Sequence, residues 1–451
     1  MEIHESQNQP PAPQPGFFQS STAKIIMVGL LTLVLLIPLQ FVNTLIEERA
    51  ERQKSVVNEI NQKWGDSLYF YGPILKVPYT THTETQITDE KTKKVTYQRT
   101  AITEYAYFFP EELNGDMSVD TEKKKRANYA SVVYKAKMNF KGHYLRPDFG
   151  NEAVAENIRW DKATILIRTD SNRSINGIVS MSLGDQNYTF EPVTLTEGQY
   201  TMPALETPAF DLTGAFSEKM PFNLNINYNG SQKISVVPIG KMTGLKMSSD
   251  WNSPSFDGNF LPQDSTVTDS SFTANWKVSH INRAFGQKHF GSLPGFSEVT
   301  TCDVNFLLPV DQYQQNERAS KYGFLVIGLT FLVFFLIQSV SKISIHLFQY
   351  SMIGLALIMF YTLLISITEH STFTTAYIIA GVSVVAMIAL YSRSILKSIK
   401  FPAFIAIALG ALYVFIYVII QLENYALLVG SIGLFLILGA VMYFSRKIEW
   451  R

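Results

Sequence analysis

Six long apolar segments dominate the hydrophobic pattern of this chain. The first is separated from the other five by residues 47–321, a long stretch that is polar or alternates between polar and apolar positions. A helix needs about 20 apolar residues to cross the hydrocarbon core of a bilayer, and each segment meets that requirement without a charged residue in its interior. The expected membrane-spanning helices are residues 25–46, 322–340, 347–368, 374–391, 401–421 and 425–444. The pattern predicts one anchoring helix, a large extramembrane domain and a compact five-helix bundle.

The basic residues of the short connecting segments predict the orientation of the spans. If the N-terminus is cytoplasmic, all of these basic residues lie on the cytoplasmic side, and Glu369 and Glu423 lie on the opposite side. We therefore expect two cytoplasmic tails, 1–24 and 445–451, and a periplasmic domain. The first tail is polar and proline-rich, which is typical of disorder. The basic residues are Lys24, Lys342, Arg393, Lys397, Lys400, Arg446, Lys447 and Arg451.

The domain of residues 47–321 carries the period-2 alternation of half-buried strands. Turn signals occur at 114–116, 184–185 and 229–230. Alternation of this kind predicts antiparallel sheets with one buried face, most simply a sandwich or two stacked β layers. The clearest alternating segments are 94–98, 132–140, 163–169, 177–183, 222–228 and 272–278.

Helical stretches are expected at both ends of this domain. Residues 47–64 are rich in helix formers and end before Gly65, and residues 312–322 lead into the second span. We expect the two stretches to pack together as stalks. Their opposite charges suggest ion pairs between them, and the alternative is that both carry ordinary solvated helix faces. The charged residues concerned are Glu47, Glu48, Arg49, Glu51 and Arg52 on the first stretch, and Glu317, Arg318 and Lys321 on the second.

Composition adds little about chemistry. The formal net charge is zero, with 38 basic and 38 acidic residues, so no nucleic-acid partner is implied. The single cysteine, Cys302, excludes a disulfide within the chain and lies on the apolar side of an alternating segment. The seven histidines do not have the spacing of metal ligands. We expect no metal and no cofactor.

The segment from Trp251 to Pro262 is the first candidate binding site. Aromatic rings provide contact area at a small cost in conformational entropy, so this loop suits a recognition surface. The alternative is a structural β-bend whose rings fill the core. The candidate residues are Trp251, Pro254, Phe256, Phe260 and Pro262.

Polar residues at the membrane boundaries form the second candidate set: Gln338, Glu369 and His370. An acid next to an imidazole can move protons or bind a lipid head group, and the alternative is a pair that caps its own helix. The basic run 123–126 suits anionic lipid or glycan phosphates, and a solvated hairpin turn is the alternative.

Residues 248–262 read SSDWNSPSFDGNFLP, and this block resembles the signature of the CreD family of bacterial inner-membrane proteins. Others occur in the order typical of the family: GPILKVP at 72–78, FTANW at 272–276, PVDQYQ at 309–314, RASKY at 318–322, and Glu369-His370 with Phe373. The resemblance implies a Gram-negative inner-membrane protein associated with envelope integrity and with the Cre system, which responds to envelope and β-lactam stress.

Two positions depart from the family pattern. Gln338 stands where related sequences commonly have Glu, and Leu347 follows His346 where they usually have Pro. A function that needs a titratable group at Gln338 is therefore not expected in this chain.

Three classes of function are compatible with these features. Ion-coupled transport is disfavoured, because proton-coupled transporters usually place ionisable residues within their spans. We expect a non-enzymatic envelope protein whose β domain binds an envelope protein, lipid or peptidoglycan component. The alternative is a channel or carrier for a neutral or lipid-like substrate, and a polar groove across the bundle would favour it. An enzyme is the third class, and it would depend on Glu369, His370 and Glu423.

Overall fold

The computed structural model describes residues 21–88, 95–150, 152, 157–197, 200–213, 219–295, 298–306, 312–341, 345–396, 399–422 and 425–446. The chain divides into two compact units. Met1–Lys54 with Val310–Arg451 form one, called the membrane unit below, and Ser55–Pro309 form the other, called the β domain. Most of the tail expected to be disordered, residues 1–20, lies outside the described residues.

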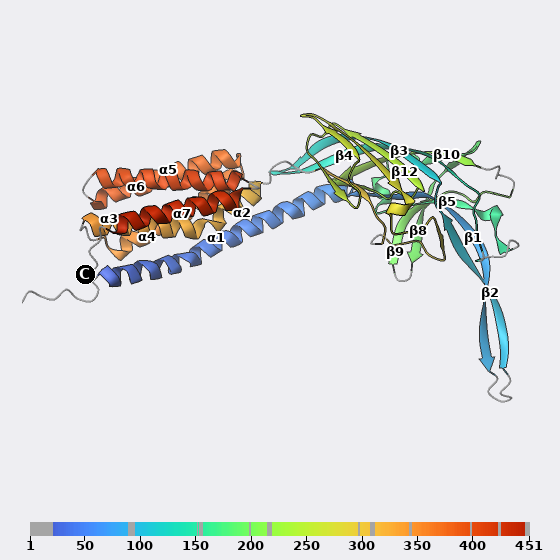
Figure 1. The fold of residues 1–451 in the computed structure, drawn as a ribbon, viewed down its shortest axis with the longest axis horizontal. Coiled ribbons are helices and arrows are strands. Elements are labelled where there is room, and N and C mark those ends of the chain that lie inside the picture. The colour runs from blue at the N-terminus through green and yellow to red at the C-terminus, as the bar shows by residue number, and fades with distance from the viewer. Residues whose placement is uncertain are drawn as a thin grey trace, which may run out of the picture. The chain divides into compact units, whose positions relative to one another are not determined.

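The helices confirm the predicted arrangement of one span followed by five. Five helices are individually long and apolar enough to cross a membrane, and α2 with α3 forms a sixth candidate span, bent by 41°. Helix α1 continues without a break through the first expected span and the helical stretch after it (Figure 1). The helices are α1 (Ser21–Trp64), α2 (Gln312–Lys321), α3 (Gly323–Ser341), α4 (Leu347–Thr368), α5 (Phe373–Leu396), α6 (Lys400–Gln421) and α7 (Ala426–Ser445).

Aromatic and small residues organise the packing of the membrane unit. Helices α4, α5 and α6 pack in sequence, and the rings of Phe360, Tyr377 and Tyr413 from these three helices meet at centroid distances of 4.6 to 6.3 Å. Gly354 of α4 lets α1 approach, because a Cβ atom there would overlap Leu35. Close approach at glycine is a common device for packing helices in lipid, where no hydrophobic driving force draws helices together.

The β domain contains two sheets, as the alternation predicted. In the described residues, one has the strand order β13-β17-β11-β1-β5-β9-β8, with β2 paired to β1 and β16 paired to β2. The other has the order β14-β15-β12-β3-β4-β10-β6-β7. The first sheet comprises β1 (Leu68–Thr88), β2 (Val95–Phe108), β5 (Thr164–Thr169), β8 (Glu191–Glu197), β9 (Tyr200–Glu206), β11 (Lys233–Val236), β13 (Pro254–Gly258), β16 (Lys288–Phe290) and β17 (Cys302–Phe306). The second comprises β3 (Glu112–Arg126), β4 (Tyr129–Tyr144), β6 (Ser180–Leu183), β7 (Gln186–Thr189), β10 (Met220–Ser231), β12 (Met242–Ser249), β14 (Asp264–Val267) and β15 (Phe272–Ser279).

The sheets are mixed rather than purely antiparallel. Strand β1 pairs in parallel with β11, and β3 pairs in parallel with β12. Parallel neighbours need a long crossover connection, and both pairs join strands that lie far apart in sequence. Alternation within one strand carries no information about the direction of its neighbour, so the prediction of antiparallel sheets was incomplete.

Two of the three predicted turns were wrong. Asn114-Gly115 lies inside β3, and Asn229-Gly230 lies inside β10. Both glycines make room for rings instead. A Cβ at Gly115 would lie 2.7 Å from the Phe140 ring, and one at Gly230 would overlap Tyr134. The third signal, Gly184-Asp185, does connect β6 to β7.

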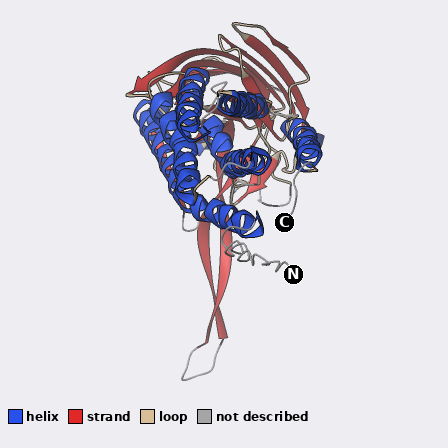
Figure 2. Cartoon of the chain, turned by 90° about the vertical axis from the view of Figure 1, so that its left-hand side faces the viewer, coloured by secondary structure: helices blue, strands red, loops and turns tan. Residues whose placement is uncertain are grey.

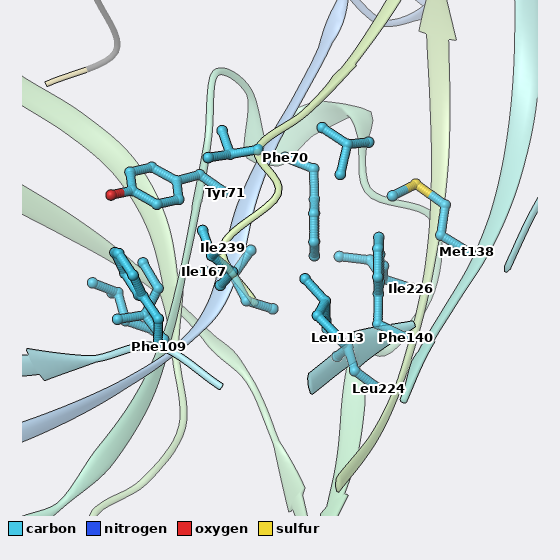
Figure 3. Close-up of a cluster of buried hydrophobic side chains, with 14 of the residues drawn as sticks. Phe70, Tyr71, Phe109, Leu113, Met138, Phe140, Ile167, Leu224, Ile226 and Ile239 are labelled. Carbon is cyan, nitrogen blue, oxygen red and sulfur yellow. The ribbon is translucent and has the colours of Figure 1, made fainter. Parts of the chain in front are cut away.

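The two sheets pack face to face around one aromatic-rich core. Phe70 of β1 and Phe140 of β4 stack with their ring centroids 4.4 Å apart. Figure 3 shows these side chains with Met138, Leu224 and Ile226 in the same cluster. Burial alternates along β10, so the period-2 pattern seen in the sequence does mark one buried face.

The C-terminal end of α1, from Ser55 onward, belongs to the β domain and docks on the β3–β4 hairpin. Asn61 is buried and its Oδ1 accepts a hydrogen bond from Ser131 Oγ at 2.6 Å. The indole N–H of Trp64 donates to the Tyr134 carbonyl at 3.3 Å. The helix ends at Trp64, and Gly65 follows with a φ of +156°, which L side chains rarely adopt; a Cβ there would also overlap the Asn229 carbonyl.

Candidate functional site

The rings of the predicted aromatic loop point into the β domain. Trp251 is buried, and its indole N–H donates to the Ser253 carbonyl at 3.0 Å. Phe256 packs edge-on against Phe272 and Trp276, at 5.8 and 6.0 Å between centroids. These contacts fit the structural bend that was considered as the alternative to a recognition surface.

The rest of the loop is held by backbone contacts. The Trp276 indole N–H donates to the Phe260 carbonyl at 3.0 Å, and Pro254 begins β13 opposite Phe306. Pro262 is half-buried, and the neighbouring Leu261 is the exposed apolar side chain of the segment. The five predicted residues therefore lie along one segment at the edge of the β-domain core, and their aromatic rings pack against that core.

The boundary residue Glu369 is joined to α1. It is the C-terminal cap of α4, and its Oε1 lies 3.2 Å from Nη1 of Arg49. His370 is exposed, and its backbone N–H donates to the Ile367 carbonyl at 3.0 Å. Glu369 thus forms an ion pair with the first helix, while His370 continues the helix-end hydrogen bonding that was the alternative reading.

Gln338 has a neutral partner in the interior of the membrane unit. Its Oε1 accepts a hydrogen bond from the Tyr350 hydroxyl at 3.0 Å, and both side chains are buried. An amide in this position bonds to a phenol without placing a charge in the bundle. His346 caps α4: its Nδ1 accepts from the Phe348 N–H, and Gln349 completes a capping box.

The basic run is tied to α1 rather than left as a freely solvated turn. Arg126 forms an ion pair with Glu59, and the Lys124 ammonium lies 4.8 Å above the Trp64 ring. The hydrogen bonds from Arg126 and Lys63 lower the pKa of the Glu59 carboxyl to about 2. The run therefore contributes to the docking of α1 on the β3–β4 hairpin.

The ion pairs at the two predicted stalks do not join the stalks. Among the described residues, Arg49 pairs with Glu369, and Lys321 pairs with Glu317 one turn earlier on its own helix. On α2, Asn316, Ala319 and Ser320 are buried, and Asn316 Oδ1 accepts a hydrogen bond from the Thr368 hydroxyl at 3.5 Å. Helix α2 packs on α3, α4, α5 and α6.

A feature that the sequence analysis missed is a two-stranded ribbon formed by the outer parts of β1 and β2, called the arm below (Figures 1 and 2). The arm consists of residues 80–88 of β1 and 95–103 of β2, paired in antiparallel register from Thr80–Thr103 to Thr88–Val95. Within the described residues, the strands that flank β1 and β2 in the sheet pair with positions outside the arm.

Both faces of the arm are exposed, which a strand that covers a core does not allow. The side chains at 82–87 and 95–103 are all exposed. The exposed large apolar residues on the arm and at its base are Ile87, Val95, Tyr97, Ile102 and Tyr105. A signal was present in the sequence, because residues 80–88 lack an apolar alternation on either face.

The two faces of the arm differ in charge. On one face, Glu84 is in register with Arg99, and His82 lies two residues away. Among the described residues of the arm, the other face has no ionisable side chain. Register places the following residues on that uncharged face: Thr81, Thr83, Thr85, Ile87, Thr96, Gln98, Thr100 and Ile102.

The base of the arm is fixed to the core. The Tyr79 hydroxyl donates to Glu104 Oε2 at 2.8 Å, and the Tyr79 ring meets Phe149 and Phe290 edge-on. The Lys76 ammonium lies 4.3 Å from the Tyr105 ring. A rigid base therefore carries an arm that is itself open to its surroundings.

Three acidic side chains, Asp66, Asp170 and Asp303, lie near the start of β1 and the end of β5. Desolvation raises the pKa of the Asp170 carboxyl to about 6, and the negative charge of Asp66 adds to the increase. Nearby, buried Asp303 forms an ion pair with Lys233 at 2.6 Å. Among the described residues there is no group of three or more His, Cys, Asp or Glu side chains arranged to hold a metal ion.

Comparison with known proteins identifies the family. The family model described as Inner membrane protein CreD matches residues 20–451. The chain is 30% identical over 423 residues to the Inner membrane protein CreD of Escherichia coli strain K12, and the match covers 93% of this chain and 91% of that protein. With both comparisons extending over nearly its full length, the chain belongs to the CreD family of multi-pass inner-membrane proteins.

Proposed function

We propose that this protein is a non-enzymatic factor of envelope integrity and stress response, and that its β domain binds an envelope partner protein through the arm. The observation that carries the proposal is the exposure of both faces of the arm together with its apolar side chains. The resemblance to CreD proteins supports the envelope role. The excess of Lys and Arg in the short loops on one side of the membrane supports a periplasmic position for the β domain.

The physics of isolated ribbons favours a bound partner. A two-stranded hairpin on its own is marginally stable in water. Each of its outer edges presents unpaired N–H and C=O groups, to which a further strand can pair. Proteins use this mode to capture extended peptides, with main-chain hydrogen bonds giving affinity and alternate side chains giving specificity.

The two faces of the arm support a protein partner over a phosphate-rich one. In the described part of the arm, the uncharged face is built from Thr, Ile and Gln, and it offers β-branched contacts and no cation for a phosphate group. The other face adds Tyr97, an exposed ring of the kind enriched in protein interfaces. A neighbouring strand would contact both faces through its own alternating side chains.

In-cell photo-crosslinking tests the proposal. A photoreactive amino acid is placed at Thr85, Tyr97 or Thr100 of the arm, and the captured species are identified by mass spectrometry. Ile178 and Ile281 are matched control positions, because each is an isolated apolar side chain that is 82% exposed elsewhere on the β domain. We expect the same discrete protein from all three arm positions and from neither control.

Other outcomes would redirect or remove the proposal. Capture of lipid or glycan from the arm would contradict a protein partner. Equal capture from the arm and from the controls would show that the arm has no special role. The non-enzymatic part of the proposal predicts that Glu369→Ala and His370→Ala preserve capture by the arm and the envelope phenotype, and loss of that phenotype with capture intact would contradict it.

A further inference from the structure

An apolar groove of about 750 Å³ runs between α3, α6 and α7 in the membrane unit. Helices α3 and α7 both pack against α6, so α6 forms the floor and the other two form the walls. The lining is aliphatic and aromatic apart from Thr330 and Lys400. Representative lining residues are Val333, Ile337, Phe404, Ala408, Leu412 and Ala440.

Small side chains in α6 and α7 create the space. Ala408 and Ala411 line the groove from α6, and Ala440 lines it from α7. Gly433 of α7 and Phe415 of α6 also line the groove, and there the two helices come close, because a Cβ atom at Gly433 would overlap the Phe415 ring. The sequence thus brings the two helices together at a glycine and leaves room beside the alanines.

One end of the groove carries a positive charge. Lys400 is exposed, lines the groove and is the first residue of α6. The preceding residue, Ile399, has no side chain that can cap the helix, so the positive end of the helix dipole lies at the same place. Deeper in the groove, the Thr330 hydroxyl is buried and has no hydrogen-bond partner among the described residues.

The charge at one end of the groove favours a lipid as its occupant. Lipid tails are the apolar molecules that surround these helices, and an acyl chain is narrow enough to lie along the apolar lining with its head group beside Lys400.

We propose that the groove binds an anionic phospholipid, with one acyl chain between α3, α6 and α7 and the phosphate beside Lys400. The apolar lining suits the chain, and the ammonium group suits the phosphate. This site lies within the membrane unit and does not depend on the role of the arm. The proposal concerns a specific lipid site and not transport.

Photo-labelling with a lipid probe tests the site. The full-length protein is reconstituted in vesicles of phosphatidylethanolamine and phosphatidylglycerol that contain a phosphatidylglycerol with a diazirine in its acyl chain. Labelled residues are then mapped by mass spectrometry. We expect labelling to concentrate on groove residues such as Val333 and Leu412, and to decrease when unlabelled phosphatidylglycerol is added.

Two substitutions in one helix provide the matched comparison. Ala408→Phe fills the groove, and Ala403→Phe places the same ring on an exposed position of α6 that does not line it. We expect Ala408→Phe to abolish the concentrated labelling and Ala403→Phe to preserve it. Lys400→Gln should lower the preference for phosphatidylglycerol over phosphatidylcholine by about fivefold, because one basic residue near anionic lipid contributes about that factor.

The results that would overturn the proposal are distinct. Labelling spread over all outward faces in proportion to their exposure would mean ordinary surrounding lipid. Intermolecular crosslinks from a cysteine at Leu436, with no lipid label in the groove, would mean that a second copy covers it. If Ala408→Phe and Ala403→Phe reduce labelling equally, the groove is not the site, provided that both variants elute as monodisperse species in detergent.

Discussion

Exposed hydrophobic side chains have different meanings in the two units of this protein. In the membrane unit, α7 exposes Leu427 and Phe435 at 88% and 75% of their surface. Lipid tails are as apolar as these side chains, so such exposure has no cost in a bilayer. In the β domain, water is the solvent. Several of its exposed apolar residues lie together on the arm and at its base. The same surface property therefore indicates the solvent in the membrane unit, and in the β domain it supports the partner proposed above.

Buried polar groups also differ between the units. The membrane unit buries neutral pairs, such as Gln338 with Tyr350 and Asn316 with Thr368. The β domain buries charged groups, such as Asp303 paired with Lys233. A charge needs compensation that a lipid-surrounded bundle does not supply easily, whereas a β domain in water can keep one partner near the surface.

The sharpest test of the comparison replaces a phenylalanine in each unit. Phe140→Ala removes a ring stacked on Phe70 in the β-domain core. A substitution of this kind costs about 3–5 kcal/mol of stability. The measurement is the urea dependence of proteolysis of the purified, detergent-solubilised protein, with fragments of the β domain and of the membrane unit followed separately.

Phe435→Ala is the matched control, because Phe435 is an exposed residue of α7. In detergent we expect its effect to stay below about 0.5 kcal/mol. Comparable destabilisation by both substitutions would show that α7 is covered by protein, and the contrast between the two solvents would then fail.

A second test concerns packing within the membrane unit. Gly354→Leu forces a side chain into the contact of α4 with Leu35 of α1 and with the Phe331 ring, which lies 2.9 Å from the Cβ position. Overpacking of this kind costs about 1–3 kcal/mol. Thermal unfolding in detergent, followed by size-exclusion chromatography, measures the loss.

Gly328→Leu is the control for that test. Gly328 lies in α3, and no atom comes within 4 Å of a Cβ built there. We expect this variant to match the parent or exceed it, because glycine is a poor helix former. Equal losses in the two variants would mean that α1 does not pack on α4 through Gly354.

The sequence predicted the elements of the fold better than their arrangement. Span length and hydropathy are local properties, and all six expected spans overlap the helices of the structure. Alternation located the strands for the same reason. The parallel pairings of β1 with β11 and of β3 with β12 join distant segments, and no local pattern encodes them.

Glycine shows why local signals mislead. Gly115 and Gly230 follow asparagine and were therefore interpreted as turns, yet each faces an aromatic ring contributed by β4. The candidate loop was identified by its aromatic residues, such as Trp251 and Phe256. The sequence shows that a residue is aromatic, but it does not show whether the ring packs in a core or contacts a partner. The arm was missed because its evidence is exposure, which depends on what the rest of the chain leaves uncovered.

The acidic group at the end of β5 predicts a pH-dependent effect in the β domain. The pKa of Asp170 is about 6 in the folded protein, against 3.8 for an ordinary aspartate. The folded state therefore favours the protonated carboxyl, and this contribution to stability is present below pH 3.8 and lost as the pH rises through 6. Asp170→Asn stays neutral, so it should exceed the parent in stability above pH 6.

The difference should shrink towards zero as the pH falls below about 4, because the parent is then neutral as well. Urea titrations of parent and variant between pH 4 and 8 measure it. Asp66→Asn serves as a second variant: removal of its charge should lower the pKa of Asp170 and so reduce the effect. A stability difference that does not change with pH would show that hydrogen bonding, not ionisation, distinguishes Asp170 from Asn.

A substitution on the arm should have the smallest effect on stability. It tests directly whether exposed apolar side chains in the water-facing domain serve a partner. Tyr97→Thr removes a ring that is 65% exposed and replaces it with a β-branched residue, which also suits a strand. Because the ring covers no core, the free energy of unfolding should change by less than about 0.5 kcal/mol. Protein capture by crosslinking from Thr85 should nevertheless be lost.

The control, Ile281→Thr, should leave both the free energy of unfolding and the capture from Thr85 unchanged. If Tyr97→Thr instead costs 2 kcal/mol or more in the purified protein, the ring is packed against the protein itself, and its exposure no longer indicates a partner.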